Sequence, residues 1–187
     1  MTVIETGRLV IRRWTEADLD RILAIYSQWE VARWLGATPR AMAGPDEAAA
    51  ALARWTAQTD ESADRYGCWA IEPKDSGVAA GSVLFKPLPN SDGSTPTDIE
   101  VGWHLHPDSW GHGYATEAAQ AVMDRGLESG LPEVVAVVYP DNHRSIAVCR
   151  RLGMTPIGRT DRWYGVEVEA FRRSRADWLN EPSGPAG

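Results

Sequence analysis

The chain has 187 residues, with 26 Asp and Glu against 19 Lys and Arg, so its net charge is −7. This length predicts one domain with a sizeable hydrophobic core rather than two domains. Nucleic-acid binding depends on clustered Lys and Arg, and the basic runs here are no longer than pairs such as Arg150-Arg151. We therefore expect no nucleic-acid partner.

The N-terminal third predicts one strand followed by two helices. Apolar and basic residues alternate over 8–14, which is typical of a strand. Residues 15–18 (Thr-Glu-Ala-Asp) have the pattern of a capping box, and apolar residues then recur at helical spacing as far as Trp29. Asp46 is placed to cap a second, alanine-rich helix that ends at about Gln58.

The middle of the chain predicts three strands. Two short apolar runs at 67–73 and 79–87 flank the turn-forming sequence Lys-Asp-Ser-Gly, so we expect them to pair as an antiparallel hairpin. A loop rich in Pro, Gly and Ser separates this hairpin from a further strand over 98–106.

The pattern becomes helical after Gly113. Small and apolar residues recur every three or four positions over 115–127, which predicts a helix. Residues 134–139 are apolar, as expected for a strand that is covered on both faces. The dipeptide Asp-Asn at 141–142 is placed to cap another helix, which ends at Gly153.

The C-terminal part predicts two strands joined by a turn over 154–175, and a disordered tail over 181–187. The chain contains no internal repeat and no second domain. We therefore expect a single α/β (α+β) domain over 1–180, built on one mixed sheet.

The cysteines and the N-terminus indicate the compartment. Cys68 and Cys149 fit neither a disulfide framework nor the ligand spacing of a zinc site, so we expect no metal. The first fifteen residues contain four charged side chains and no apolar core of a signal peptide, and the longest run of small apolar residues, 48–53, is too short to span a membrane. These features favour a cytoplasmic protein with no membrane partner.

The most informative segment is 107–116, where a strand ends, a short loop carries Gly111 and Gly113, and a helix begins. The start of a helix exposes backbone N–H groups, and the helix dipole favours an anion there. Glycine lacks the Cβ that would keep phosphate oxygens away from the backbone, and Thr116 adds a hydroxyl. The geometry therefore suits a diphosphate.

Other interpretations of this loop are weaker. It lacks the Gly-Lys-Ser/Thr of a P-loop. As a dinucleotide-binding fingerprint it would place Thr116 where the third glycine belongs, and too few residues follow Gly113 to complete that fold. An ordinary glycine-containing turn stays open if the loop is considered alone.

Two motifs together give a more specific indication. Residues 110–115 read Trp-Gly-His-Gly-Tyr-Ala, followed by Thr-Glu-Ala, and residues 142–145 read Asn-His-Arg-Ser before an apolar helix that ends in Leu-Gly-Met at 152–154. With the N-terminal TGRLVIRRWTEADLD, these motifs resemble the GNAT superfamily of acetyl-CoA-dependent N-acetyltransferases, and specifically its RimJ/RimL-like branch. The resemblance covers residues 5 to about 173.

The resemblance implies a mostly antiparallel sheet of about six or seven strands, flanked by about four helices. The sheet would splay between the strands at 98–106 and 134–140, with the pantetheine arm of acetyl-CoA in the gap and the Leu105 N–H near the thioester oxygen. The implied cofactor-binding residues are Trp103, His104, Leu105, Trp110, Gly111, His112, Gly113, Tyr114, Ala115, Thr116, Asn142 and Ser145.

Acetyl transfer to an amine needs a base that collects the proton of the nucleophile. Glu100, on the strand that enters the splay and two positions before Gly102, is the first candidate, acting directly or through water. His104 is the alternative, because residues 100, 102 and 104 point to the same face of a strand.

The leaving thiolate also needs a hydrogen-bond donor. Many family members have a Tyr seven residues after the Asn, and here that position is Cys149. The branch implies that Ser145 donates to the sulfur instead. Tyr164, in the final hairpin, is an alternative acid.

The acceptor implied by the family is a primary amine, either the N-terminus of a peptide or protein or a small amine. Four tryptophans, at positions 29, 34, 55 and 163, are candidates for an aromatic wall at the acceptor site, and the acidic net charge favours a cationic amine. A homodimer is common in the family. A different class of function, a non-catalytic acyl-CoA-binding or sensor domain, stays open because Cys149 replaces the usual acid.

Overall fold

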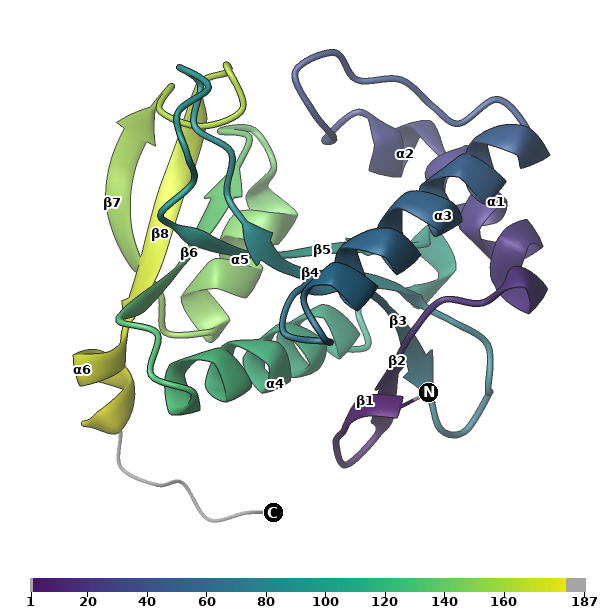
Figure 1. The fold of residues 1–187 in the computed structure, drawn as a ribbon, viewed down its shortest axis with the longest axis horizontal. Helices are drawn as coiled ribbons and strands as arrows, with labels where there is room; N and C mark the ends of the chain where they lie inside the picture. Colours follow the sequence, from purple (N-terminus) through teal and green to yellow (C-terminus); the bar gives the residue numbers. More distant parts are fainter. Residues whose placement is uncertain (1, 181–187) are drawn as a thin grey trace.

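The computed structural model describes residues 2–180, which form one eight-stranded sheet in the order β1-β2-β3-β4-β5-β6-β8-β7 (Figure 1). Neighbouring strands are antiparallel except β5 and β6, which are parallel. The strands are β1 (Thr2–Glu5), β2 (Leu9–Arg12), β3 (Gly67–Pro73), β4 (Gly81–Pro87), β5 (Ile99–Leu105), β6 (Glu133–Val138), β7 (Thr155–Thr160) and β8 (Val168–Ser174).

Six α-helices and two short 3-10 turns flank the sheet within the described residues. The 3-10 turns lie at Glu16–Asp18 and Pro107–Ser109. The α-helices are α1 (Leu19–Tyr26), α2 (Trp29–Ala32), α3 (Pro45–Glu61), α4 (Tyr114–Glu128), α5 (His143–Arg151) and α6 (Arg175–Leu179).

The helices divide between the two faces of the sheet. On one face, α4 and α5 cover the alternate positions that include Phe85 and Val101, which share a buried cluster with Met123 of α4. On the other face, α1 and α3 pack over Ala70 and its neighbours in a second buried cluster. The central strands are apolar on both faces because both faces are covered.

The two halves of the sheet meet at the parallel pair β5 and β6. Their register is defined by Glu100 opposite Val135 alone, whereas β4 and β5 pair along the whole length of β5. Beyond Glu100 the two strands diverge, so the backbone of β5 toward Leu105 has no strand beside it on that side. The splay implied by the family resemblance is present at the expected strands.

The predicted single, mixed and mostly antiparallel α/β sheet is confirmed, with one strand more than expected. The additional strand is β1, which has four residues and is too short for a periodic pattern to reveal it. The hairpin of β3 and β4, the strand β5, the long helix α4 and the strand β6 all lie where the sequence predicted them.

The predicted helices required three corrections. The first predicted helix is two, because Gln28 adopts an extended conformation and Trp29 starts α2. Asp46 is not the cap of α3: Gly44 occupies that position and Pro45, which needs no N–H partner there, begins the helix. The short helix α6 was not predicted.

Several expectations concern features outside the core. The tail predicted over 181–187 lies outside the described residues. Within residues 2–180, none of the helices combines the length and the apolar character that a membrane span requires. Cys68 and Cys149 are buried free thiols. Residues 2–180 contain no group of three His, Cys, Asp or Glu side chains arranged to hold a metal ion.

Candidate active site

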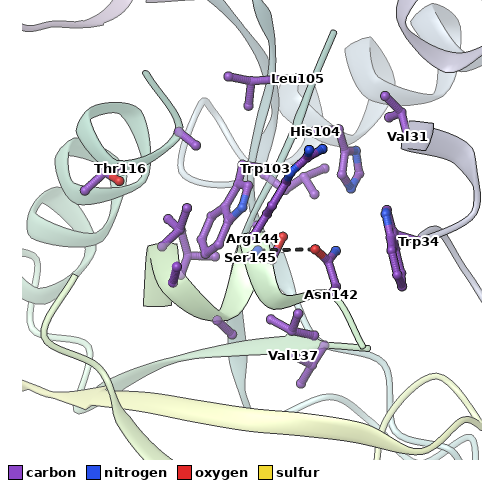
Figure 2. Close-up of a pocket in the computed structure, with 18 of the residues that line it drawn as sticks. Val31, Trp34, Trp103, His104, Leu105, Thr116, Val137, Asn142, Arg144 and Ser145 are labelled. Atoms are coloured by element: carbon purple, nitrogen blue, oxygen red, sulfur yellow. Dashed lines mark hydrogen bonds between the residues drawn. The ribbon is translucent and has the colours of Figure 1, made fainter. Parts of the chain in front are cut away.

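A cleft of about 1400 Å³ lies at the splay. Its lining includes Leu105 and Ala136 from one face of the sheet and Glu100 and Val137 from the other, so the cleft passes through the gap between β5 and β6. Figure 2 shows Thr116 of α4 on one side of this pocket, Trp34 and His104 on the other, and the start of α5 between them.

The loop before α4 presents backbone rather than side chains to the cleft. Gly111 and Gly113 have φ angles of 84° and 81°, in the left-handed region that glycine adopts without strain. Gly113 is the N-cap of α4, and the N–H groups of the first helical turn have no partner inside the helix. The Oγ1 of Thr116 is buried and lacks a hydrogen-bond partner among the described residues, and Thr116 lines the cleft.

Two arginines add positive charge at this loop. Arg8 donates a hydrogen bond from Nη1 to the carbonyl oxygen of His112 at 3.0 Å and pairs with Glu117 at 2.6 Å. Arg144 lies over the ring of Trp110 at 4.3 Å from its centroid. We call residues 110–116 with Arg8 and Arg144 the loop end of the cleft; the arginines were not predicted from sequence.

The backbone of β5 faces the gap at Leu105. The N–H of His106 donates to the carbonyl oxygen of Ala80 at 2.9 Å, on the β4 side. Because N–H groups alternate between the two sides of a strand, those of Leu105 and Trp103 point the other way, toward the gap. The Leu105 carbonyl accepts a hydrogen bond from the Trp110 indole at 2.9 Å, whereas the Leu105 N–H has no partner in the described part of the chain.

The start of α5 forms another wall. The Oδ1 of Asn142 accepts a hydrogen bond from the backbone N–H of Ser145 at 3.2 Å, so the predicted capping role is observed (Figure 2). The amide nitrogen of Asn142 and the hydroxyl of Ser145 have no partner among the described residues, and both residues line the cleft. Both side chains therefore keep donors for a ligand.

Glu100 lies at the opposite end of the cleft in a cluster with Lys86 and Tyr164. The Tyr164 hydroxyl donates to Oε2 of Glu100 and accepts a hydrogen bond from Nζ of Lys86 at 2.9 Å. Nζ forms an ion pair with Oε2 at 3.7 Å, and Oε1 of Glu100, a residue that lines the cleft, has no hydrogen-bond partner within residues 2–180. We call these three residues the carboxylate end.

The environment of the carboxylate end changes its acid–base properties. Glu100 is 6% exposed, and burial raises the pKa of its carboxyl, against the opposing effects of Lys86 and Tyr164. Burial and the adjacent Glu100 also raise the pKa of the Tyr164 phenol. Because the hydroxyl proton of Tyr164 is donated to Glu100, this residue is a partner of the candidate base and not a free acid.

His104 shares the face of Glu100, as strand alternation predicted, and belongs to a separate network. Its Nδ1 lies 3.2 Å from the hydroxyl of Tyr26, which donates to Ser82 at 2.8 Å. Burial, with a smaller effect of Lys86, lowers the pKa of His104 to about 4, so the ring is neutral near pH 7. A neutral, oriented imidazole remains in reach of the cleft.

The expected aromatic wall is mostly wrong. Trp34 lines the cleft, but Trp29 is 54% exposed and lies outside it. Trp55 packs against Trp14 and Tyr26 in the core, and Trp163 is buried with its indole donating to Asp98. These side chains occupy core or surface positions because the helices and the turn that carry them direct them away from the splay.

A different aromatic contact closes this side of the cleft. The ring of Tyr139, at the end of β6, lies 6.2 Å from that of Trp34, and its hydroxyl donates to the Gly36 carbonyl at 2.6 Å. The contact joins the segment after α2 to the end of β6. The sequence did not predict that Tyr139 and Lys86 line the cleft. The one signal that could have indicated them is that each is a polar residue at the end of an apolar strand.

Comparisons with known proteins agree with this architecture. A family model described as "Acetyltransferase (GNAT) domain" matches residues 8–155. The uncharacterised N-acetyltransferase YoaA of Bacillus subtilis is 29% identical over 157 residues, which cover 83% of this chain and 84% of YoaA.

Solved structures share the fold. A GNAT-family acetyltransferase from Bacillus anthracis matches with a TM-score of 0.75 and 19% identity, over 94% of this chain and 99% of that one. RimL, a ribosomal L7/L12 alpha-N-protein acetyltransferase solved with coenzyme A, matches with a TM-score of 0.74 and 17% identity, over 93% and 98%. The fold of this chain is thus one that solved acetyltransferases share.

Proposed function

Because this chain belongs to the GNAT acetyltransferase family, we propose that it transfers the acetyl group of acetyl-CoA directly to a primary amine. The observation that carries this proposal is a single cleft that joins the exposed helix start of the loop end to the buried carboxylate of Glu100. A donor bound at one end and an amine bound at the other would meet in the gap of the sheet.

The residues of the loop end fit the cofactor. The glycines leave room that a Cβ would fill, the first turn of α4 supplies N–H donors, and Thr116 has a buried hydroxyl without a partner. Arg8 and Arg144 would balance the negative charge of a diphosphate. When bound, acetyl-CoA supplies an activated thioester, and the Leu105 N–H is placed to donate to a ligand oxygen in the gap.

Glu100 is the proposed base. Its Oε2 is fixed by Tyr164, while Oε1 opens to the cleft and can accept a proton from the amine, directly or through one water. The raised pKa of the carboxyl makes it a stronger base than an exposed glutamate. His104 is neutral and is the second candidate.

Ser145 is the proposed donor to the leaving thiolate. Its hydroxyl is unpaired at the start of α5, and Cys149, which stands where many relatives have Tyr, is buried and has a pKa raised by burial to about 12. The Cys149 thiol is not part of the cleft lining and cannot reach the leaving sulfur, whereas Ser145 of the same helix lines the cleft with its hydroxyl.

A free-thiol assay with acetyl-CoA and a panel of amines tests the proposal. We expect CoA release that depends on the amine, with formation of the acetylated amine detected by mass spectrometry. Tight binding of acetyl-CoA without amine-dependent release from any class of amine would instead indicate a binding or sensor domain. The indoles of Trp103 and Trp110 line the cleft, so their fluorescence provides an independent readout of acetyl-CoA binding.

A further inference from the structure

Lys86 contacts Tyr164 and Glu100 in the carboxylate end, and no role toward the substrate has been assigned to it so far. It is one of two lysines in the chain, and the other, Lys74, pairs with Glu5 outside the cleft. Lys86 lies on β4 directly opposite Glu100 of β5, and its side chain is 24% exposed. A mostly covered ammonium beside the proposed base needs a reason to be there, because burying a charge is costly.

The hydrogen bonds of Lys86 are incomplete. An ammonium has three protons to donate. One is donated to the Tyr164 hydroxyl at 2.9 Å, and the 3.7 Å separation from Oε2 of Glu100 is too long for a second hydrogen bond. Lys86 has no further hydrogen-bond partner among the described residues, and it lines the cleft. Beside its ion pair with Glu100, the ammonium therefore has donors that are not used in hydrogen bonds within the described residues.

The free donors lie beside the free oxygen of Glu100. Oε2 of Glu100 accepts from Tyr164 and lies 3.7 Å from Nζ of Lys86, whereas Oε1 of the same carboxyl group has no hydrogen-bond partner among the described residues, and Glu100 lines the cleft. One group accepts an N–H and the other donates to an oxygen. In an α-amino acid the amine nitrogen and a carboxylate oxygen are held about 3 Å apart by the carbon between them, which matches such a pair of neighbouring sites.

We propose that the acceptor is an α-amino acid or a close analogue, whose amine binds at Oε1 of Glu100 and whose carboxylate binds at Nζ of Lys86. This inference rests on the proposed function and names the substrate class of the same site. The side chain of the acceptor would contact the apolar residues that line this part of the cleft, which are Leu84, Val137, Val166 and Val168.

Electrostatics supports an anionic group on the acceptor. The ammonium of Lys86 weakens the attraction of Glu100 for an acceptor that carries only positive charge, such as a polyamine, and attracts a carboxylate on the acceptor. The same fixed cation favours the neutral form of a nearby amine, which is the form that attacks a thioester. An ion pair in a partly covered site gains more than one in water.

The test compares leucine, leucinamide and 3-methylbutylamine as acceptors, and phenylalanine with phenylalaninamide. The side chain is constant within each set, and only the carboxylate changes. The amine of an amino-acid amide is the less basic, so intrinsic reactivity favours the amide, and a preference for the acid must come from the protein. We expect kcat/KM for the acid to exceed that for the amide by about tenfold or more, as for one charge-assisted pair.

Variants of the two lysines locate the source of that preference. Lys86→Met should lower the ratio of kcat/KM for acid over amide by about tenfold, mainly through KM of the acid, and Lys86→Arg should restore most of it. Lys74→Met removes the other lysine, outside the cleft, and should leave the ratio as it is. Fluorescence titration with acetyl-CoA verifies that each variant is folded.

Three results would overturn the inference. If the wild type has an equal kcat/KM for the amide and for the acid, the cleft has no site for a carboxylate. An equal loss of kcat for every acceptor in Lys86→Met assigns Lys86 to the positioning of Glu100 alone. If acetyl-CoA binds and no amine of any class is acetylated, the proposed function fails and this inference fails with it. If amines are acetylated but α-amino acids are not, this inference fails while the proposed function stands.

Discussion

The two ends of the cleft are built in different ways. The loop end presents backbone N–H groups of one continuous segment, with glycines in place of side chains. The carboxylate end presents side chains of β4, of β5 and of the turn before β8, held together by hydrogen bonds. A backbone site suits a ligand shared by a whole family, whereas a side-chain site can change with each substrate, so we expect the carboxylate end to determine acceptor specificity.

The two ends also differ in charge and exposure. Arg8 and the loop glycines are exposed, and the positive charge there faces solvent. Lys86 and Glu100 are largely buried, so their opposite charges attract each other at short range in a less polar medium. Substitutions at the loop end should therefore change cofactor affinity, and substitutions at the carboxylate end should change turnover and acceptor choice.

The largest effect is expected from Glu100→Gln. Gln keeps the shape and the hydrogen bond from Tyr164 but cannot take a proton, so kcat/KM for the best amine of the panel should fall by about 10² to 10³. The wild-type rate should fall as pH drops through the raised pKa of Glu100, above the usual range of a glutamate. The thiol-release assay measures both.

If the two ends of the cleft act separately, the Kd of Glu100→Gln for acetyl-CoA should lie within about twofold of the wild-type value. A loss of cofactor affinity as large as the loss of rate would mean that the two ends are not separate. A rate loss below threefold would assign the base to His104 or to a chain of water molecules.

The second effect concerns stability rather than rate. The pKa of His104 is lowered to about 4 in the folded protein, whereas an unfolded chain has the ordinary value near 6.5. Between these two pH values the unfolded state binds more protons than the folded state. The contribution of His104 to the free energy of unfolding is therefore fully present above pH 6.5 and is lost as the pH falls toward 4. The loss between pH 7 and 4.5 is about 2 kcal/mol.

His104→Gln removes this titration and leaves the other groups in place. Asp108, whose pKa lies at about 2, also destabilises the fold on acidification and is unchanged in the variant. Urea unfolding of both proteins at pH 7 and 4.5 should therefore show a smaller pH dependence for His104→Gln. Equal pH dependence in the two proteins would mean that His104 is not buried as a neutral ring.

The difference between the two ends also explains what could be predicted from the sequence. Gly111, Gly113 and the cap Asn142 carry local signals, because a left-handed φ or a helix start restricts the residue type at one position. Lys86 and Tyr164 reach Glu100 from positions 14 and 64 residues away, through strand register and a turn. Such contacts leave no local pattern, so this end was predicted only in part.

The tryptophans show the same limit. Trp34 and Trp163 lie on segments that were both expected to face the acceptor, but only Trp34 lines the cleft. Trp163 is 2% exposed because the turn directs it into a cluster with Val135 and Leu88. A segment can be placed from its pattern, whereas the direction of one side chain in a turn depends on packing that forms only in the fold.

The third effect isolates the loop end. Gly113 has a φ of 81°, and a Cβ there would lie 3.3 Å from Nη2 of Arg8. Gly113→Val introduces a β-branched side chain in a left-handed conformation and moves the N–H donors, so Kd for acetyl-CoA should rise about tenfold or more. Isothermal titration calorimetry measures the change.

Gly130→Val is the matched control for Gly113→Val. Gly130 follows the other end of α4, has a φ of 99° and has nothing within 4 Å of the added Cβ. The backbone strain is therefore similar, but the site is remote from the cleft. If both variants weakened acetyl-CoA binding equally, the effect would be loss of fold stability and not loss of the helix-start donors.

The smallest effect is expected where the two ends meet, at Ser145. Its hydroxyl has no partner within the described residues and would donate to the sulfur only as the thiolate forms, so Ser145→Ala should lower kcat about tenfold and leave Kd for acetyl-CoA nearly intact. Ser145→Thr keeps the hydroxyl and should recover most of the rate. An unchanged kcat and Kd would remove Ser145 from the mechanism, and a weaker Kd with an unchanged kcat would place Ser145 in cofactor binding, with the loop end.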